Sequence, residues 1–253
     1  MRPVMTNSPP TSFGTVAIVG VGLIGGSLAA ALKRRGLATK ILGVGRSRGK
    51  LQGAIDKGLL DEATESLKDA GEADLIVFCT PVERIAGGVR EVAPHCRKGT
   101  LITDAGSVKG TICRELTTGL PTEVTFIGSH PIAGSEKQGY EAALEDLFEN
   151  KTCVVTPTDV TPRGELQRLI RFWEGVGSKV VELTPEKHDE ILAATSHLPH
   201  LLAAALAATL QQDQEDFVGS GFRDTTRIAA GDAGLWQEIL LSNVPALLKA
   251  ANE

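Results

Sequence analysis

One histidine stands where a general base would be expected. His130 lies in Gly128–Glu136, which reads GSHPIAGSE and follows the short apolar run Val124–Ile127. An imidazole titrates near neutral pH, so a partly exposed histidine at the carboxyl end of a strand can accept a proton from a substrate hydroxyl. We therefore predict a general base on a Gly/Pro-rich turn directly after a strand. The alternative is a turn histidine whose ring is hydrogen-bonded to the backbone.

A glycine-rich turn near the N-terminus predicts a dinucleotide site. Residues 16–36 read VAIVGVGLIGGSLAAALKRRG, a β-branched run followed by GVGLIG and an alanine- and leucine-rich helix. Gly20 permits a tight turn, Gly22 lets the backbone approach a pyrophosphate, and Gly25 lets helix and strand pack closely, while the helix N-terminus faces the anion. The predicted cofactor contacts in this turn are Gly20, Gly22, Leu23, Ile24 and Gly25. The alternative is a glycine-rich turn without a ligand.

The end of the second predicted strand, Lys40–Val44, bears on the choice of cofactor. An NAD site usually has Asp or Glu there, and that carboxylate repels a 2′-phosphate. This chain has Arg46, Ser47 and Arg48 instead. Two guanidinium groups and a hydroxyl suit a phosphate, because arginine offers planar, charge-assisted donors. The sequence therefore predicts NADP. The alternative is that Arg46 stacks on adenine and Arg48 is solvated, which leaves NAD usable.

Two further strand ends carry polar residues that would face the same space. Thr80 and Pro81 follow the apolar run Leu75–Cys79, and Ser107 follows the predicted strand Thr100–Asp104. An open doubly wound sheet binds its ligands in the crevice outside the carboxyl ends of its strands. We therefore expect Thr80 and Pro81 to approach the cofactor and Ser107 to reach the space occupied by His130.

The composition agrees with a soluble enzyme. A chain of 253 residues with 42% hydrophobic and 23% charged content can bury a sizeable core and divide into two domains. A net charge of −5 and only 4% aromatic residues argue against nucleic-acid binding. We find no run of about 18 apolar residues and no apolar leader segment, so we expect no membrane association. Four widely spaced cysteines without a CxxC motif indicate reduced thiols in a cytoplasmic protein.

Alternating strand and helix patterns predict an α/β fold with a doubly wound, Rossmann-type sheet. We assign residues 1–14 to a disordered tail and residues 15–183 to a dinucleotide-binding domain. Continuous apolar runs bounded by turn residues are typical of parallel strands that are covered on both faces. The last two predicted strands, Thr152–Thr156 and Lys179–Leu183, would extend this sheet.

From residue 184 the pattern is helical to the end, so we assign residues 184–253 to an all-helical C-terminal dimerisation domain. Thr184 and Pro185 are a typical helix start. Apolar residues recur all round Leu198–Leu210, which predicts a helix buried on most sides. The same helix of a second subunit commonly covers such a segment, so we expect a homodimer through the C-terminal helices.

Two polar segments interrupt this helical domain. Pro199 in SHLPH should kink its helix near His197 and His200, which share one face. Two histidines are too few for a zinc site, so we predict no metal and assign them to the wall of a substrate pocket. Further on, Gly221–Ala229 reads GFRDTTRIA and contains Arg227. This segment is either a ligand site or an ordinary solvated charge cluster.

Taken together, these motifs resemble the prephenate/arogenate dehydrogenase family of tyrosine biosynthesis. The resemblance spans residues 15–250 and is carried by GVGLIGGS at Gly20–Ser27 with its preceding strand, CTPV at Cys79–Val82, DAGSVKG at Asp104–Gly110, GSHPIAGSE, SHLPH and FRDTTRIA. It implies oxidative decarboxylation: a hydride leaves C4 of a cyclohexadienol for the nicotinamide while the ring carboxylate departs as CO2. Because the chain ends soon after the helical segment, we expect no appended regulatory domain.

The resemblance also implies roles for individual residues. His130 would hydrogen-bond the C4 hydroxyl and accept its proton, Ser107 would orient that hydroxyl and the imidazole, and Arg227 would bind a substrate carboxylate. The other implied substrate contacts are Ser129, His197 and His200. The choice between prephenate and arogenate stays open, because Asp224 could pair with an amino group of arogenate or hold Arg227 by a local ion pair.

Two other functions stay open at this point. One is a different NAD(P)-dependent hydroxyacid dehydrogenase, which would lack SHLPH and would normally carry a catalytic lysine. The other is a regulator that senses NADP without turnover. Such a regulator needs the glycine-rich turn but has no use for Ser107, His130 and Arg227 together.

Overall fold

The protein divides into two compact units, residues 1–185 and residues 186–253. The computed structural model describes residues 13–135 and 137–253. Most of the predicted tail, residues 1–12, lies outside the described residues. Its last two residues already belong to strand β1, because the Phe13 side chain is buried and its N–H donates to the Leu37 carbonyl at 2.9 Å.

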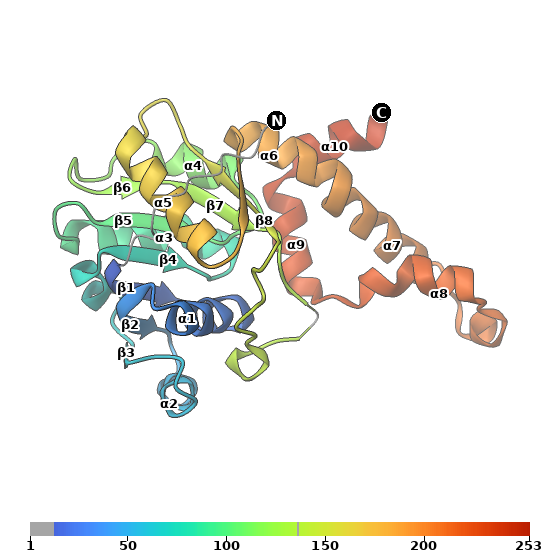
Figure 1. The fold of residues 1–253 in the computed structure, drawn as a ribbon. Coiled ribbons are helices and arrows are strands. Elements are labelled where there is room, and N and C mark those ends of the chain that lie inside the picture. The colour runs from blue at the N-terminus through green and yellow to red at the C-terminus, as the bar shows by residue number, and fades with distance from the viewer. Residues whose placement is uncertain (1–12, 136) are drawn as a thin grey trace. The chain divides into compact units, whose positions relative to one another are not determined.

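The first unit contains a parallel sheet of six strands in the order β3-β2-β1-β4-β5-β6 (Figure 1). The strands are β1 (Phe13–Val19), β2 (Ala38–Val44), β3 (Glu62–Thr64), β4 (Leu75–Phe78), β5 (Leu101–Asp104) and β6 (Thr125–Phe126). The predicted Rossmann-type fold is confirmed, since this order places the turn after β1 at the point where the winding reverses. The short edge strand β3 was not predicted.

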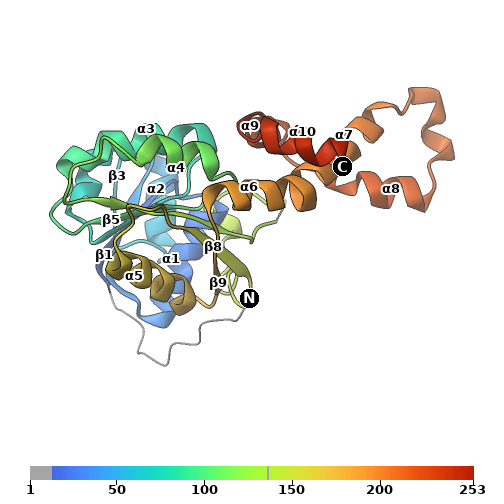
Figure 2. The ribbon, with the colours of Figure 1, turned by 90° about the horizontal axis from the view of Figure 1, so that it is seen from above.

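Helices cover both faces of this sheet. Figure 2 shows α3 and α4 on one face and α1 and α5 on the other. The bounds are α1 (Leu23–Arg35), α2 (Arg48–Asp56), α3 (Val82–Val92), α4 (Gly110–Leu116) and α5 (Arg163–Gly175), with the 3₁₀ turns η1 (Leu67–Glu72), η2 (Ala93–His95) and η3 (Tyr140–Ala142).

A second sheet of three strands corrects two predictions. Its order is β7 (Gly128–Pro131), β8 (Thr152–Thr156) and β9 (Lys179–Glu182), so the last strands do not extend the first sheet. The chain leaves the parallel ladder after Ile127, whose N–H still donates to Ile102, and pairs β7 antiparallel with β8. His130 therefore lies within a strand, opposite Val154, and not on a turn.

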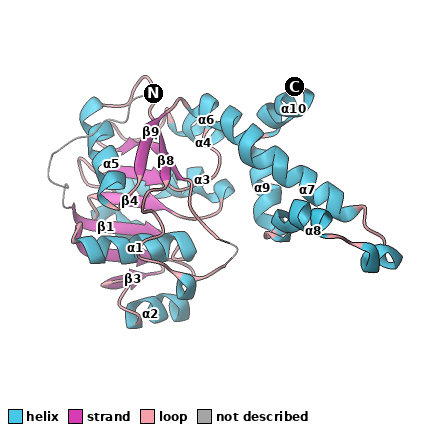
Figure 3. Cartoon of the chain, turned by 45° about the vertical axis from the view of Figure 1, so that its right-hand side comes forward, coloured by secondary structure: helices cyan, strands magenta, loops and turns pink. Residues whose placement is uncertain are grey.

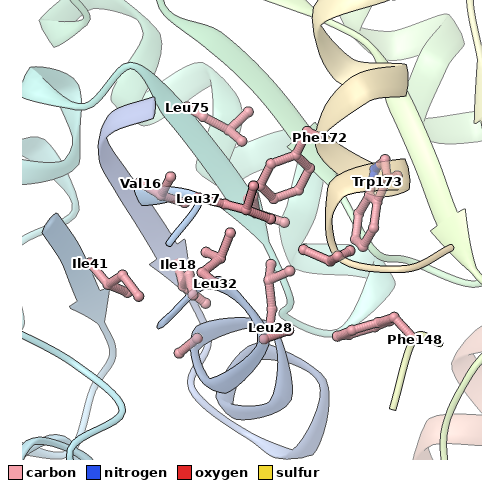
Figure 4. Close-up of a cluster of buried hydrophobic side chains, with 14 of the residues drawn as sticks. Val16, Ile18, Leu28, Leu32, Leu37, Ile41, Leu75, Phe148, Phe172 and Trp173 are labelled. Carbon is pink, nitrogen blue, oxygen red and sulfur yellow. The ribbon is translucent and has the colours of Figure 1, made fainter. Parts of the chain in front are cut away.

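An aromatic and aliphatic core holds α1 and α5 against the same strands (Figure 4). The Trp173 ring meets the rings of Phe148 and Phe172 edge-on, with centroids 5.8 Å and 5.2 Å away. Such edge contacts stabilise beyond the apolar area that they bury. Leu28 and Leu32 of α1 are fully buried in this cluster, which fixes the helix that begins at the glycine-rich turn.

The second unit is entirely helical in its described part, as predicted (Figure 3). Its elements are α6 (Pro185–Leu192), the π-helix η4 (Ala193–His197), α7 (Leu198–Ala208), η5 (Gln212–Phe217), α8 (Ser220–Thr226), η6 (Arg227–Ala230), α9 (Ala233–Ser242) and α10 (Val244–Asn252). In place of a simple kink, the π-helical turn precedes Pro199. The wider turn accommodates a residue that has no N–H to donate and whose ring crowds the preceding turn.

The prediction that α7 is buried on most sides is wrong for the single chain. Leu201 and Leu202 are 38% and 60% exposed, and only His200 and Ala203 of this helix are buried. The continuous helical segment Pro185–Ala208 is also long and apolar enough to cross a membrane by length and composition alone. That finding corrects our expectation that no such segment exists. It is weak evidence for a membrane role, because helices that pack against other helices meet the same criteria.

Candidate active site

A cleft of about 630 Å³ lies at the carboxyl ends of strands β1, β2 and β4. Its size is within the range of small-molecule sites. Its walls include Gly20, Val21, Gly22, Arg46, Ser47, Lys50, Glu65, Thr80, Pro81, Arg84 and Glu91. The predicted glycine-rich turn, the end of β2 and the Thr80–Pro81 turn thus come together around one cavity.

The three glycines of the turn have three different surroundings. Gly20 has a φ of +93°, and a Cβ there would stand 2.8 Å from the Cys79 carbonyl oxygen. A Cβ on Gly25 would collide with the Gly20 carbonyl oxygen, so close packing of helix and turn requires glycine. A Cβ on Gly22 would meet nothing within 4 Å, so this glycine keeps space open over the cleft.

The residues that line the cleft include donors without a partner. Gly22 is the N-cap of α1 and makes no side-chain cap, and the first turn of α1 contains no acidic residue. The Thr80 Oγ1 atom is buried without a hydrogen-bond partner. A helix N-terminus with free N–H groups attracts an anion. A buried hydroxyl without a hydrogen-bond partner is unfavourable unless a ligand atom bonds to it. Both features fit a dinucleotide.

The cations of the cleft differ from the predicted set. Arg46 and Ser47 line it together with Lys50 and Leu51 of α2, whereas Arg48 does not. Lys50 and Arg84 were not predicted. The Leu23 side chain is buried in the hydrophobic core, so Leu23 could offer a ligand only its backbone, and the half-buried Ile24 side chain packs against the same core.

A buried ion pair holds the turn after β5. The Lys109 ammonium contacts the Asp104 carboxylate, and both side chains are completely buried. The Gly106 N–H donates to Asp104 Oδ2 at 2.9 Å, and the Ser129 N–H donates to Oδ1 at 3.1 Å. Lys109 Nζ in turn donates to the Ser129 carbonyl at 2.9 Å. One ion pair therefore links the turn that carries Ser107 to the strand that carries His130.

Ser129 faces the interior of the protein, which corrects its predicted role as a substrate contact. Its side chain is fully buried, and its hydroxyl donates to the Asp104 carbonyl at 2.5 Å and accepts from Trp173 Nε1 at 3.0 Å. Side chains alternate along a strand, so the half-buried His130 points to the opposite face. Ser129 thus anchors the strand, and the imidazole of His130 is the group presented away from the core.

In the second unit a neutral histidine is held by an amide. His197 is 1% exposed, and its Nδ1 atom lies 3.0 Å from Asn243 Nδ2. Burial lowers the pKa of His197 to about 4, although the nearby Asp189 carboxylate acts in the opposite direction. His197 is therefore uncharged at neutral pH.

His200 and Arg227 occupy contrasting environments in the same unit. The His200 ring stacks on Trp236 with centroids 3.6 Å apart, its Nδ1 atom is buried without a partner, and burial lowers its pKa. Arg227 is exposed and begins η6, which packs against α7. Within the described residues, no ion pair joins Asp224 to Arg227.

No group of three or more His, Cys, Asp or Glu side chains that could hold a metal occurs within 13–135 and 137–253. All four cysteines are free. Burial raises the pKa of the Cys79 thiol to about 12, and burial likewise raises that of Cys153. These thiols are therefore protonated and unsuited to act as nucleophiles at neutral pH.

One signal in the sequence could have revealed the buried ion pair. Asp104 closes the short strand Leu101–Asp104, which we expect to be buried, and a buried carboxylate requires a partner. Lys109 stands five residues later, so the pair was within reach of this reasoning. The roles of Asn243 and Trp236 had no comparable signal, because only the folded helices bring them to His197 and His200.

Comparisons with known proteins agree along most of the chain. Residues 28–182 match the family model "Prephenate dehydrogenase, nucleotide-binding domain", and residues 184–253 match "Prephenate dehydrogenase, dimerization domain". A cyclohexadienyl dehydrogenase of Zymomonas mobilis is 35% identical over 94% of this chain and 84% of its own length. A prephenate dehydrogenase of Bacillus subtilis is 34% identical over 94% of this chain and 67% of its own length.

Two solved structures are also similar. The prephenate dehydrogenase of Aquifex aeolicus, in complex with hydroxyphenyl propionate and NAD+, has a TM-score of 0.90 and 36% identity, covering 96% of this chain and 87% of that one. The arogenate dehydrogenase of Synechocystis has a TM-score of 0.80 and 35% identity, covering 94% of this chain and 87% of that one.

Proposed function

The chain belongs to the prephenate dehydrogenase family, and we propose that His130 is the residue that moves the proton in its reaction. The chain is an NAD(P)-dependent prephenate/arogenate dehydrogenase of tyrosine biosynthesis. In this reaction the substrate loses a hydride from C4 and its ring carboxylate as CO2, while the proton of its C4 hydroxyl passes to the base and is returned to the oxygen of the aromatic product. When bound, the nicotinamide accepts the hydride. Formation of the aromatic ring favours the loss of CO2, so the protein needs a base and binding groups more than an acid.

The observation that carries this proposal is the way His130 is held. Strand pairing with β8 and the link from Ser129 to Asp104 fix its backbone, and its ring lies on the face opposite the buried Ser129 hydroxyl. A base fixed in this way needs no reorganisation before it accepts the hydroxyl proton. Ser107, on the turn braced by the same carboxylate, would orient the hydroxyl and the imidazole.

The substrate contacts in the second unit would be Arg227, His197 and His200. Arg227 is the cation that we assign to a substrate carboxylate, because a guanidinium offers two parallel donors to its oxygens. His197 is uncharged at neutral pH and would act as a hydrogen-bonding group. His200, stacked on Trp236 and with an unsatisfied Nδ1, would form part of the pocket wall.

NADP is the cofactor that we expect this chain to prefer. Three cations, Arg46, Lys50 and Arg84, line the cleft, and no acidic residue stands at the end of β2. A 2′-phosphate would gain charge-assisted hydrogen bonds there, whereas an NAD ribose would lack its usual carboxylate acceptor. The Aquifex relative was solved with NAD+, so NAD is the alternative for this chain.

We also propose that the protein is a homodimer through its C-terminal helices. The match to a dimerization domain and the apolar side chains exposed on the second unit support this assembly. Leu202, Leu241 and Leu248 are 60%, 66% and 59% exposed. Exposed apolar surface of this kind marks a protein interface. The four free cysteines agree with the cytoplasmic location that we propose.

Turnover with defined substrates tests the proposed function. The purified protein is incubated with prephenate or arogenate and with NADP or NAD, and the absorbance of the reduced nicotinamide is followed. We expect turnover of at least one of the two substrates, with NADP preferred. Turnover of a hydroxy acid but of neither cyclohexadienol would indicate the other dehydrogenase class. Binding of NADP without turnover of any of them would indicate a regulator.

A further inference from the structure

A buried hydrogen-bond network surrounds His197 in the second unit. We propose that Asn243 is a positioning residue that holds His197 in its Nε2–H tautomer, so that the imidazole donates a hydrogen bond to the substrate from Nε2. This inference rests on the proposed function, in which His197 contacts the substrate. Asn243 stands between α9 and α10, and its side chain reaches back to the first helices of the unit.

The first step is the orientation of the Asn243 amide. Its Nδ2 atom lies 2.9 Å from the Asp189 backbone carbonyl. A backbone carbonyl only accepts hydrogen bonds, so the atom that faces it must be the NH2 group and not the amide oxygen. Exchange of the two amide atoms would place two oxygens against each other in a buried site. The carbonyl of Asp189 therefore determines which way the amide points.

The second step is the tautomer of His197. The same NH2 group lies 3.0 Å from His197 Nδ1. Both of its hydrogens are then used, one on the carbonyl and one on the ring nitrogen, so Nδ1 must accept and cannot carry a proton. A neutral imidazole carries its single proton on the other nitrogen, which is Nε2. The Asp189 carbonyl thus fixes the orientation of the Asn243 amide, and this amide fixes the tautomer of the His197 ring.

The third step is the charge of the ring. His197 is almost completely buried, and burial lowers its pKa to about 4. The charged or titratable groups that act on this pKa are the Asp189 carboxylate, which raises it, and His188, which lowers it. Asp189 Oδ1 lies 2.8 Å from His188 Nδ1, and Trp236 of α9 meets the His197 ring edge-on. His197 is consequently a fixed donor at neutral pH and not a spare general base.

Nitrogen-15 spectra of histidine side chains read the tautomer directly. The protein is labelled at its histidines and recorded at neutral pH, and the His197 signals are those absent from the spectrum of His197→Gln. We expect an unprotonated Nδ1 and a protonated Nε2 in the parent protein. A protonated Nδ1 would overturn the proposal without any variant of Asn243.

Variants of Asn243 test whether this residue sets the tautomer. Asn243→Asp replaces the donor with an acceptor of the same shape, so His197 Nδ1 should gain a proton in the same spectra. The matched control is Asn252→Asp, a change at an exposed asparagine at the far end of α10, which should leave the His197 signals in place. An unchanged Nδ1 in Asn243→Asp would contradict the proposed role.

A double-variant cycle separates positioning from simple structural support. Asn243→Leu should raise the Michaelis constant for substrate by about 2- to 10-fold, as expected for one neutral hydrogen bond, with little change in turnover. In the His197→Gln background the introduced amide always offers a donor, so Asn243→Leu should change the constant there by less than about 2-fold. An equal loss in both backgrounds would mean that Asn243 only supports the fold.

The same variants distinguish this inference from the proposed function. If His197→Ala leaves the substrate constants unchanged, His197 does not contact substrate, and donation from Nε2 is refuted even though the tautomer is correct. If His197→Ala weakens substrate but the spectra show a protonated Nδ1, the pocket role stands and the positioning role of Asn243 is refuted.

Discussion

Asp104 and Lys109 form an ion pair in which neither side chain is exposed to solvent. The pair closes the turn between β5 and α4, and each partner also bonds the backbone of Ser129 in β7. Moving two charges out of water costs several kcal/mol per ion. This cost is offset only by the attraction between closely placed charges and by further hydrogen bonds. The turn that carries Ser107 and the strand that carries His130 are therefore both held by the Asp104–Lys109 ion pair.

Loss of this pair should destabilise the protein strongly. Lys109→Met leaves the Asp104 carboxylate buried without its cation, and we expect the free energy of unfolding to fall by about 3 to 5 kcal/mol. Lys98→Met is the matched control, because Lys98 pairs with Glu123 at an exposed site and should change stability by less than about 1 kcal/mol. Urea denaturation of both variants measures the difference. Similar losses in the two variants would mean that burial of the Asp104–Lys109 pair has no special importance.

A charge reversal in the cofactor cleft tests the proposed preference for NADP. Arg46→Asp places a carboxylate where the 2′-phosphate would bind, so it should weaken NADP and spare or improve NAD. The control is Arg48→Asp, which makes the same change two residues away at a position that does not line the cleft. Steady-state constants for both cofactors decide the matter. A clear NAD preference in the parent protein, or an unchanged NADP constant in Arg46→Asp, would show that the assignment is wrong.

Removal of the proposed carboxylate anchor should affect substrate and not cofactor. Arg227→Ala loses a charge-assisted bidentate partner, which costs roughly 2 to 4 kcal/mol and should raise the Michaelis constant for substrate strongly. Arg223→Ala is the control, because Arg223 is also exposed and lies one helical turn earlier. Cofactor titration by fluorescence should give the parent value in both variants. An unchanged substrate constant in Arg227→Ala would place this residue in a solvated charge cluster.

Local patterns predicted the parallel sheet and the cofactor turn, because each depends on neighbours in the chain. Gly20 and Gly25 are examples, since the positive φ of one and the close packing of the other follow from a strand, turn and helix in sequence. The antiparallel pairing of β7 with β8 was not predictable in the same way. A run such as Val124–Ile127 does not reveal that the next residue pairs with a strand that begins more than 20 residues later.

The second unit shows a further limit of sequence reasoning. The apolar pattern of α7 predicts a buried helix, yet Leu202 is 60% exposed, because the pattern also reflects any partner that covers the helix. Ser129 shows the converse, since the family resemblance implied a substrate contact whereas strand alternation turns its hydroxyl to Trp173. The hydrophobic pattern of a segment indicates whether it forms a helix or a strand. Which side of that helix or strand faces a ligand depends on the neighbouring elements or subunits against which it packs.

Stability should decrease in mild acid because of the second unit's histidines. Burial lowers the pKa of His197 from 6.5 to about 4, so the unfolded chain binds a proton there more readily than the folded one. The neutral His197 side chain makes its full contribution to the free energy of unfolding above about pH 6.5. This contribution, on the order of 3 kcal/mol, is lost as the pH falls towards 4. Denaturation at a series of pH values should show this loss, and His197→Gln should remove it. An identical pH dependence in His197→Gln would assign the effect to other groups, of which His200 is the first to test.

Substitution of His130 tests directly whether this residue accepts the hydroxyl proton in the proposed mechanism. His130→Asn keeps a hydrogen-bonding group but removes the base, so turnover should fall by about 10² to 10⁴ with little change in either binding constant. The parent rate should also drop as pH falls through the range in which histidines ordinarily titrate, and the residual rate of the variant should lose that dependence. His95→Asn, a change at an exposed histidine of η2, should behave like the parent. If His130→Asn keeps more than about a tenth of parental turnover, the proton goes elsewhere, and His197 or a bound water is the next base to test.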